Sequence, residues 1–286
     1  MLRARISNSS GETLELTGNE PVYQLVNIEG LNPPPAVLNQ TDIYGMDGAL
    51  FNSSKLATRN IVLTVYINGD VEVNRLRLYS YFRTKEKCTF YVTTDTLDVE
   101  IDGYVDTVEC NMFQQNVFAQ ISLICMNPYF HGVAQTETGM IGAEALFTFP
   151  FSINIDDPIP ISNHTEADAL VVLNAGESDT GCEIIVSALA GFSTLEIADL
   201  TTGDTFKLVG TFLAGDTIII NTVKGAKSVE LVRAGVVSNA LSTLQQDSVF
   251  FQLAPGANAF GIIIDGVEND GAVDMTIRYY LNYRGL

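Results

Sequence analysis

Short runs in which apolar and polar residues alternate dominate the chain, and they predict strands rather than helices. The runs are roughly four to eight residues long, rich in β-branched and aromatic residues, and bounded by Gly, Asn, Asp or Pro. The clearest are Asn60–Ile67, Cys88–Thr93, Leu97–Ile101, Ala119–Cys125, Ala169–Leu173, Glu183–Ala188, Thr205–Val209, Thr217–Asn221, Ser228–Val232 and Asp274–Tyr280. The chain is therefore predicted to be mainly β.

The segment Val71–Lys87 departs from this pattern and predicts a single helix. Neither Gly nor Pro interrupts the segment, and basic residues gather near its end, where cations suit the helix dipole. Asn74 is the candidate N-cap. The apolar residues of the segment recur at about every third position: Val73, Leu76, Leu78, Tyr79 and Phe82. We expect one amphipathic helix that lies on a sheet.

A small, polar, glycine-containing stretch between Pro128 and Ala143 interrupts the strand pattern. We place the domain boundary there, with a first domain over residues 1–133 and a second over residues 134–286. The first is predicted to be a β-sandwich or barrel-like domain that carries the helix. The second contains about ten short strands at spacings of roughly 8–12 residues, which is typical of a β-sandwich.

The charge balance excludes one large class of partner. The formal net charge is −19, the pI is about 4.2, and no basic run occurs. A protein that grips nucleic acid needs a basic face to displace the counterions of the phosphates, so we expect no specific nucleic-acid binding. An acidic wall past which DNA slides remains compatible with this charge. The longest apolar runs, such as Ile218–Ile220 and Ile262–Ile264, are far too short to span a bilayer, so we expect no membrane insertion.

The chain is poor in groups that carry catalysis. Its histidines are His131 and His164, and neither has a cysteine, a second histidine or a paired carboxylate near it in the sequence. The cysteines show no CxxC or metal-finger spacing, and no phosphate-binding loop or zinc-protease motif occurs. We expect buried reduced thiols, no catalytic residue, no metal site and no cofactor. The chain is therefore predicted not to be an enzyme.

One acidic cluster resembles a calcium loop at first sight. Its members are Asp265, Glu268, Asp270 and Asp274. Calcium loops place their ligand oxygens at alternate positions around a correctly placed glycine, and this cluster has neither the spacing nor the glycine. We expect a solvated hairpin between two strands instead.

A proline-led segment early in the chain suggests a partner. Asn32 and the prolines after it predict a stiff extended stretch, and Thr41–Phe51 then mixes apolar residues with glycines without clean periodicity. Such an arm either packs as an ordinary loop or becomes ordered against another molecule. In an isolated monomer its apolar side chains would form a sticky patch, so we favour a subunit-interface arm. The residues assigned to this interface are Pro33, Pro34, Pro35, Tyr44, Met46, Leu50 and Phe51.

The order of these features resembles the distal tail proteins of long-tailed bacteriophages, the siphovirus tail component family. The resemblance covers nearly the whole chain, and it rests on the order and spacing of motifs rather than on any single one. In the first domain the motifs are Pro33–Pro35, Gly45–Gly48, Arg59, the helix residues Asn74, Arg75 and Tyr79, Ile101–Val105, Gln120–Cys125 and Asn127–Phe130. In the second they are Leu173–Gly176, Gly215–Asp216, Ile218–Thr222, Leu253–Asn258 and Arg278–Leu286.

The resemblance implies a structural role in the virion. It implies a homo-hexameric ring formed through the N-terminal domain, with a back-to-back dodecamer as a second form in isolation. Such a ring lies between the tail tube protein and the tail-tip hub or baseplate proteins, and the DNA passes through its hole. The C-terminal domain is then a galectin-like sandwich that faces outward and can hold receptor-binding or adaptor proteins. Assembly would take place in the host bacterial cytoplasm.

Two other functions remain as alternatives. A carbohydrate-binding adhesin would use the second domain, and a glycan array with residues from about 142 to 286 would identify it. Such sites usually present an aromatic platform, often Trp, and the chain has no Trp. A peptidoglycan hydrolase would need a metal site or a carboxylate pair, which the sequence does not offer. The aromatic residues of the second domain up to residue 278 are expected in the core: Phe147, Phe149, Phe151, Phe192, Phe206, Phe212, Phe250, Phe251 and Phe260.

Overall fold

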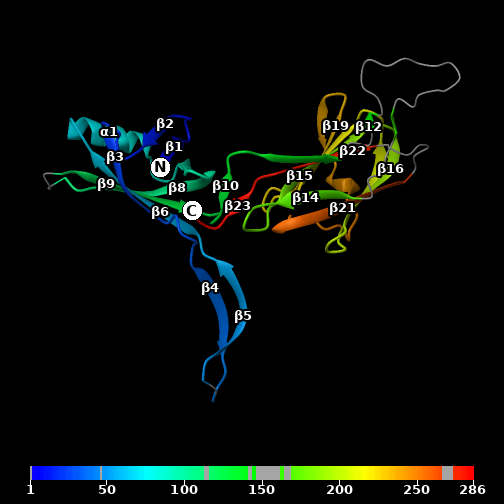
Figure 1. Ribbon diagram of the computed structural model, residues 1–286, viewed down its shortest axis with the longest axis horizontal. Coiled ribbons are helices and arrows are strands. Elements are labelled where there is room, and N and C mark those ends of the chain that lie inside the picture. The colour runs from blue at the N-terminus through cyan, green and yellow to red at the C-terminus, as the bar shows by residue number, and fades with distance from the viewer. Residues whose placement is uncertain are drawn as a thin grey trace. The chain divides into compact units, whose positions relative to one another are not determined.

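The chain folds into two compact units, each with its own hydrophobic core (Figure 1). The computed structural model describes residues 2–45, 47–112, 116–140, 144–145, 162–163, 169–265 and 273–286. Unit 1 consists of residues 1–134 together with residues 282–286, and unit 2 consists of residues 135–281. The chain therefore crosses from one unit to the other twice, after Ala134 and after Leu281.

Unit 1 is built around one antiparallel sheet. Seven strands follow one another across it in the order β2-β1-β7-β8-β9-β6-β3, and β10 joins the sheet by pairing with β8 and with β23. The bounds of these strands are β1 Arg3–Asn8, β2 Thr13–Leu16, β3 Tyr23–Glu29, β6 Arg59–Ile67, β7 Lys87–Thr93, β8 Asp98–Cys110, β9 Phe118–Cys125, β10 Phe130–Gly132 and β23 Asn282–Tyr283. A separate hairpin of β4 (Ala36–Asp42) and β5 (Ala49–Leu56) leaves this sheet.

Alternation of side chains explains the sheet of unit 1. Along β6, Ile61, Leu63 and Val65 are fully buried, and Val62 and Thr64 between them are half-buried. The two ends of the strand order approach each other, because the backbone N–H of Leu25 in β3 donates to the carbonyl of Thr17 at 3.0 Å. Thr17 directly follows β2, so the sheet curls toward closure and gives the barrel-like domain that the sequence predicted.

The helix α1 runs over Val71–Tyr81 and is shorter than predicted. Asp70, not Asn74, is the N-cap, and its carboxylate accepts from the backbone N–H of Val73 at 3.3 Å. The chain turns back before β7 through Lys85, which has φ 73° and donates its N–H to the carbonyl of Val105 at 2.8 Å. The last residues of the predicted helix therefore belong to a turn.

The predicted apolar face of the helix was also wrong in part. Leu78 and Phe82 are buried on the sheet, whereas Val73 and Leu76 are 59% and 53% exposed. Three residues advance a helix by about 300°, so a series at every third position drifts by about 60° at each step. Over the nine residues from Val73 to Phe82 this drift amounts to about half a turn. The two ends of the predicted series therefore lie on opposite faces.

Unit 2 is a sandwich of two antiparallel sheets. One has the order β11-β22-β15-β18-β19-β20, and the other has the order β14-β21-β16-β17. The strands of the first are β11 Thr136–Met140, β22 Val273–Tyr279, β15 Cys182–Ala188, β18 Thr217–Asn221, β19 Ser228–Arg233 and β20 Val236–Asn239. The strands of the second are β14 Leu170–Asn174, β21 Gly256–Asp265, β16 Phe192–Asp199 and β17 Thr205–Phe212. A short pair, β12 (Glu144–Ala145) with β13 (Ser162–Asn163), and a 3-10 turn at Leu241–Thr243 complete the described elements.

The inward residues of both sheets form one core. Ile184, Ile218 and Ile277 of the larger sheet and Leu195 and Phe260 of the smaller sheet are all fully buried. The prediction of a mainly β chain, with one helix and a C-terminal sandwich, is confirmed for the described residues.

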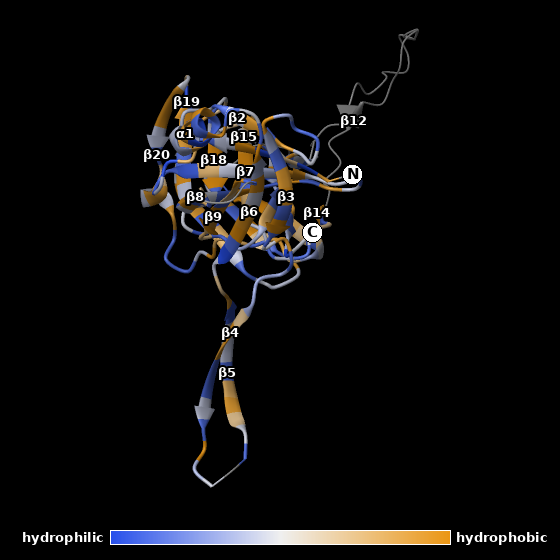
Figure 2. Cartoon of the chain, turned by 90° about the vertical axis from the view of Figure 1, so that its left-hand side faces the viewer, coloured by the Kyte–Doolittle hydropathy of each residue, from blue (hydrophilic) through white to orange (hydrophobic). Residues whose placement is uncertain are grey.

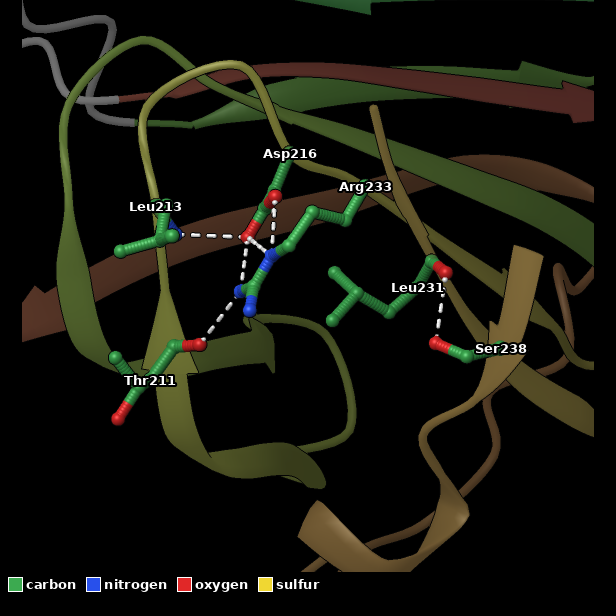
Figure 3. A network of polar contacts seen from close by, with 6 residues as sticks. All are labelled: Thr211, Leu213, Asp216, Leu231, Arg233 and Ser238. Atoms are coloured by element: carbon green, nitrogen blue, oxygen red, sulfur yellow. Dashed lines mark hydrogen bonds and ion pairs between the residues drawn. The ribbon is translucent and has the colours of Figure 1, made fainter. Parts of the chain in front are cut away.

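A buried carboxylate fixes one edge of this sandwich (Figure 3). The side chain of Asp216 is only 3% exposed, and it accepts from the Arg233 guanidinium through Nε at 2.9 Å and Nη2 at 2.6 Å. It also accepts from the backbone N–H of Leu213 at 2.7 Å, while Arg233 donates to the carbonyl of Thr211 at 2.9 Å. Asp216 thus ties the turn after β17 to the end of β19. The Arg233 hydrogen bonds hold the pKa of Asp216 below its usual range.

This network makes the stability of unit 2 depend on pH in a defined direction. Because its pKa is depressed in the folded state, Asp216 contributes stability that is complete above its unfolded pKa of about 3.9. The contribution is lost as the pH falls through the folded pKa. Asp216→Asn is expected to lower the unfolding midpoint of unit 2 by about 4 °C at pH 7, and the gap from wild type should close below about pH 4. Scanning calorimetry across this range measures it, and a gap that stays constant down to acidic pH would contradict the assignment.

Candidate functional site

The feature of unit 1 that stands out from its packed sheet is the β4–β5 hairpin, called the arm below. Figure 1 shows it leaving the sheet of unit 1 as a pair of strands with a loop at the tip. Every residue of β4 and all of β5 except Leu56 are exposed. Hydrophobic stretches nevertheless occur along both strands (Figure 2). An isolated two-stranded hairpin is marginal in water, so an exposed arm of this kind is suited to packing against another surface.

Backbone pairing and turn residues account for the shape of the arm. The ladder runs from Ala36 opposite Leu56 to Asp42 opposite Ala49, and it contains a bulge beside Asn39. The side chain of Asn52, at the bulge, donates to the hydroxyl of Thr41 at 2.8 Å. Gly45 and Gly48 take up positive φ angles of 81° and 89° in the tip.

The predicted interface residues occupy three parts of the arm. Pro33, Pro34 and Pro35 form the segment that leads into β4, and Pro35 accepts a backbone hydrogen bond from Ala57 at 3.0 Å, which closes the base. Tyr44 lies in the tip and is fully exposed. Met46 lies outside the described residues. Leu50 and Phe51 follow in β5 and are 56% and 62% exposed.

The structure adds apolar residues that sequence reasoning missed. Val37, Leu38 and Ile43 are also exposed on the arm. Leu38 and Gln40 share one face of β4, and Gln40 is the pair partner of Phe51, so Leu38 and Phe51 lie on the same face. The signal was present as an apolar run directly after Pro35. It showed no alternation that would separate exposed from buried positions, because both faces of the arm are exposed.

The arm carries few charged side chains, in about the same proportion as the whole chain. Residues 36–56 contain two carboxylates, Asp42 and Asp47, and one cation, Lys55, within a protein of net charge −19. Aromatic side chains such as Tyr and Phe are enriched at the centres of protein–protein interfaces. The arm is therefore suited to bind a complementary apolar surface, against which its exposed aromatic and aliphatic side chains would be buried.

The other candidate residues take structural roles or lie outside the description. His131 is half-buried and bridges Asn282 on Nδ1 at 2.7 Å and Asn127 on Nε2 at 3.0 Å, so it links β10 to the C-terminal strand. His164 lies outside the described residues, as do Glu268 and Asp270 of the acidic cluster. Among the residues that the structure describes, no group of three or more His, Cys, Asp or Glu side chains is placed to hold a metal ion.

The cysteines are free thiols, and most of them are buried. Burial raises the pKa of both Cys88 and Cys125 to about 12, and that of Cys182 to about 11. A thiol with such a pKa is almost entirely protonated at neutral pH, and the thiolate is the reactive form. These side chains therefore serve as core residues in both units.

The phenylalanines of unit 2 that the structure describes lie in its core or pack against it. Phe250 packs against the core at its edge, and Phe206 contacts it edge-on with ring centroids 5.1 Å apart. Phe147, Phe149 and Phe151 lie outside the described residues. The phenylalanines that are buried in the core are Phe192, Phe206, Phe212, Phe251 and Phe260.

No helix among the described residues is long and apolar enough to cross a membrane.

Comparison with known protein families accounts for most of the chain. Residues 9–125 match the family described as phage tail protein RIFT-related domain. Residues 175–283 match the family described as siphovirus-type tail component, C-terminal domain. The first match includes the arm and the helix. The second covers unit 2 from residue 175 onward and the first two residues of the segment that returns to unit 1. No curated protein sequence matches the chain.

Solved structures share the fold over nearly the full length. The Dit protein of phage SPP1, described as a paradigm of the hub adsorption apparatus of phages that infect Gram-positive bacteria, is 14% identical with a TM-score of 0.68. The match covers 98% of this chain and 98% of that chain. A chain of the activated baseplate of phage P2 is 10% identical with a TM-score of 0.55, over 97% of this chain and 98% of that chain. At these identities the likeness establishes the fold.

Proposed function

Since the chain belongs to the siphovirus-type tail component family and is a structural component of a phage tail, we propose that it forms a hexameric hub ring. In this proposal the ring is built by the N-terminal tail-hub domain, residues 1–133. It joins the tail tube to the tail-tip or baseplate proteins. The observation that carries the proposal is the arm, which presents Tyr44, Leu50 and Phe51 to solvent on a two-stranded hairpin.

Ring geometry explains why such an arm is useful. A closed ring is made of heterologous contacts, in which one face of each subunit meets a different face of the next. An arm that projects from its own sheet can reach a neighbour while the rest of unit 1 keeps its core closed. Each subunit both gives an arm and receives one, so the apolar residues of all six arms are covered when the ring closes.

The charge of the chain fits a second part of the role. A net charge of −19 repels the phosphates of DNA, which favours passage through a ring over adhesion to it. The sandwich of unit 2 would hold receptor-binding or adaptor proteins. We assign no catalytic function and no cofactor to the chain. The proposed location is the tail tip of the virion, after assembly in the host bacterial cytoplasm.

The mass of the purified protein in solution tests the ring directly. Light scattering is expected to give a hexamer, or a dodecamer of two rings back to back, and negative-stain electron microscopy of the same peak should show six-fold rings with a central hole. A species that stays monomeric at high concentration, and also in the presence of the tail tube protein, would count against the hub. A glycan array with the monomer would then test the carbohydrate-binding alternative.

A further inference from the structure

Arg59 is the largest fully buried side chain of the described residues, and it carries a charge. It is the first residue of β6 and is only 2% exposed. Its Nε donates to the carbonyl of Pro128 at 2.8 Å, and its Nη1 donates to the carbonyl of Asn32 at 2.7 Å and to that of Gly30. Its Nη2 donates to the carbonyl of Arg284. The guanidinium carbon also lies 4.4 Å from the centroid of the Phe130 ring.

These acceptors come from three segments that are far apart in the sequence. Gly30 and Asn32 lead directly into Pro33 and the arm. Pro128 and Phe130 precede the point where the chain leaves for unit 2, and Arg284 follows the point where it returns. One guanidinium therefore joins the base of the arm, the outgoing chain and the C-terminal tail, all within unit 1.

Close backbone packing brings the tail against the base of the arm. The backbone N–H of Leu286 donates to the carbonyl of Leu31 at 3.1 Å. A Cβ at Gly285 would lie only 2.7 Å from Cδ and 2.9 Å from N of Pro33, so this approach requires glycine. The tail thus touches the first proline of the segment that carries the arm.

The chemistry of the contact makes it sensitive to substitution. Among the described residues, the hydrogen-bond acceptors of Arg59 are all backbone carbonyls, so its charge is held by dipoles and an aromatic face rather than by a carboxylate. A planar guanidinium donates in several fixed directions at once, whereas a lysine ammonium is a point charge that cannot reproduce this fork. Each buried carbonyl that loses its hydrogen-bond donor destabilises the folded state.

We propose that Arg59 positions the arm, and that the C-terminal tail, residues 284–286, helps to hold the base of the arm in place. The chain then holds its own assembly element in place with the residues that return from unit 2. Without the contacts of Arg59 and the tail, the arm would move more freely about its base. It would then lose more conformational entropy when it docks to a neighbour. The functional consequence rests on the proposed ring, but the coupling of tail and arm does not.

Amide hydrogen exchange followed by mass spectrometry tests the coupling on the full chain. Two amides serve as reporters: Ala57, which donates to Pro35 at the base of the arm, and Leu286, which donates to Leu31. Arg59→Lys is expected to speed exchange at both by about tenfold or more. Gly285→Ala and a chain ending at Tyr283 are expected to do the same at Ala57, which neither change touches directly.

Matched substitutions serve as controls. Arg278→Lys changes an exposed ion pair with Glu137, and Gly261→Ala adds a methyl group that meets Leu200 at an ordinary 3.5 Å. Both should leave the two reporters unchanged. The proposal is overturned if Gly285→Ala and the shortened chain both exchange at Ala57 like wild type. It is also overturned if Arg59→Lys, Gly285→Ala and the shortened chain speed exchange at Ala57 only together with exchange throughout unit 1. Arg59 and the tail would then stabilise unit 1 as a whole and would not act on the arm in particular.

The ring is measured separately on the same proteins. If wild type forms no ring, the hub function fails while the exchange result still decides the coupling. If wild type forms a ring, the uncoupled variants are expected to need about tenfold higher concentration to assemble, because their arms are no longer held in place. If a variant exchanges fast at Ala57 and still assembles at the wild-type concentration, the contacts of Arg59 and the tail do not contribute to ring assembly.

Discussion

Tyr44→Asp combined with Phe51→Asp is expected to abolish the ring while both units stay folded. Tyr44 is fully exposed and Phe51 is 62% exposed, so neither contributes to the core of its own subunit. Burial of an aromatic side chain at an interface contributes about 1.5–3 kcal/mol, and a carboxylate in its place must be desolvated. Loss of both anchors at every interface should raise the concentration needed for assembly by about 100-fold or more.

Light scattering and circular dichroism together measure this effect. The variant should elute at the mass of a monomer, keep the strand signal of wild type and still unfold cooperatively, although loss of the ring contacts lowers its unfolding midpoint. The control is Tyr44→Phe with Phe51→Tyr, which keeps the apolar area and should keep the ring. If the double aspartate variant still forms rings of full mass, the arm is not the subunit interface.

Gly30→Ala is expected to cause the largest loss of folding stability, about 4 kcal/mol or more. Gly30 follows β3 with φ 89°, and a Cβ there would lie 2.1 Å from the carbonyl oxygen of Asn60 and 3.1 Å from Cα of Ile61. These are backbone atoms of β6, which pairs with β9 on one side and β3 on the other, so they cannot rotate away as the end of a side chain would. The substitution must therefore separate the base of the arm from β6.

A second glycine of unit 1 isolates the cause. Gly11 also has a left-handed φ of 79°, but nothing lies within 4 Å of an added Cβ. Gly11→Ala should cost only about 1–2 kcal/mol, which is the conformational penalty alone. Urea unfolding followed by tyrosine fluorescence reports on unit 1, because all tyrosines except Tyr279 and Tyr280 lie there. Equal losses for the two variants would show that the close approach at Gly30 is relaxed in solution.

The strands were accessible from the sequence because their side chains alternate. Asn60–Ile67 was predicted and Arg59–Ile67 is observed, and Cys88–Thr93 and Ala119–Cys125 are each observed as strands one residue longer at the start. In each case a buried face requires an apolar residue at every second position, so the period itself is a record of the fold. The helix was found for a similar reason, but its inward face depends on which side meets the sheet.

The arm shows where pattern reading is limited. Its residues were singled out from their composition, yet the hairpin could not be predicted, because a strand exposed on both faces has no alternation to reveal it. Leu38 belongs to the same face as Phe51 only through the cross-strand register and the bulge beside Asn39. Register is a property of two paired strands, not of either sequence alone.

The sequence by itself determined the mainly β character, the positions of many of the strands, the one helix and the acidic net charge. All of these follow from local periodicity or from composition. Only the tertiary structure decided that the C-terminal tail returns to unit 1. It also decided that Arg59 is buried and joins three chain segments through its hydrogen bonds, rather than lying on the surface. The acceptors of Arg59 are carbonyls of Gly30, Asn32, Pro128 and Arg284, and carbonyls are common to every residue. A site built from backbone atoms leaves no trace in side-chain pattern, so the fold alone brings it together.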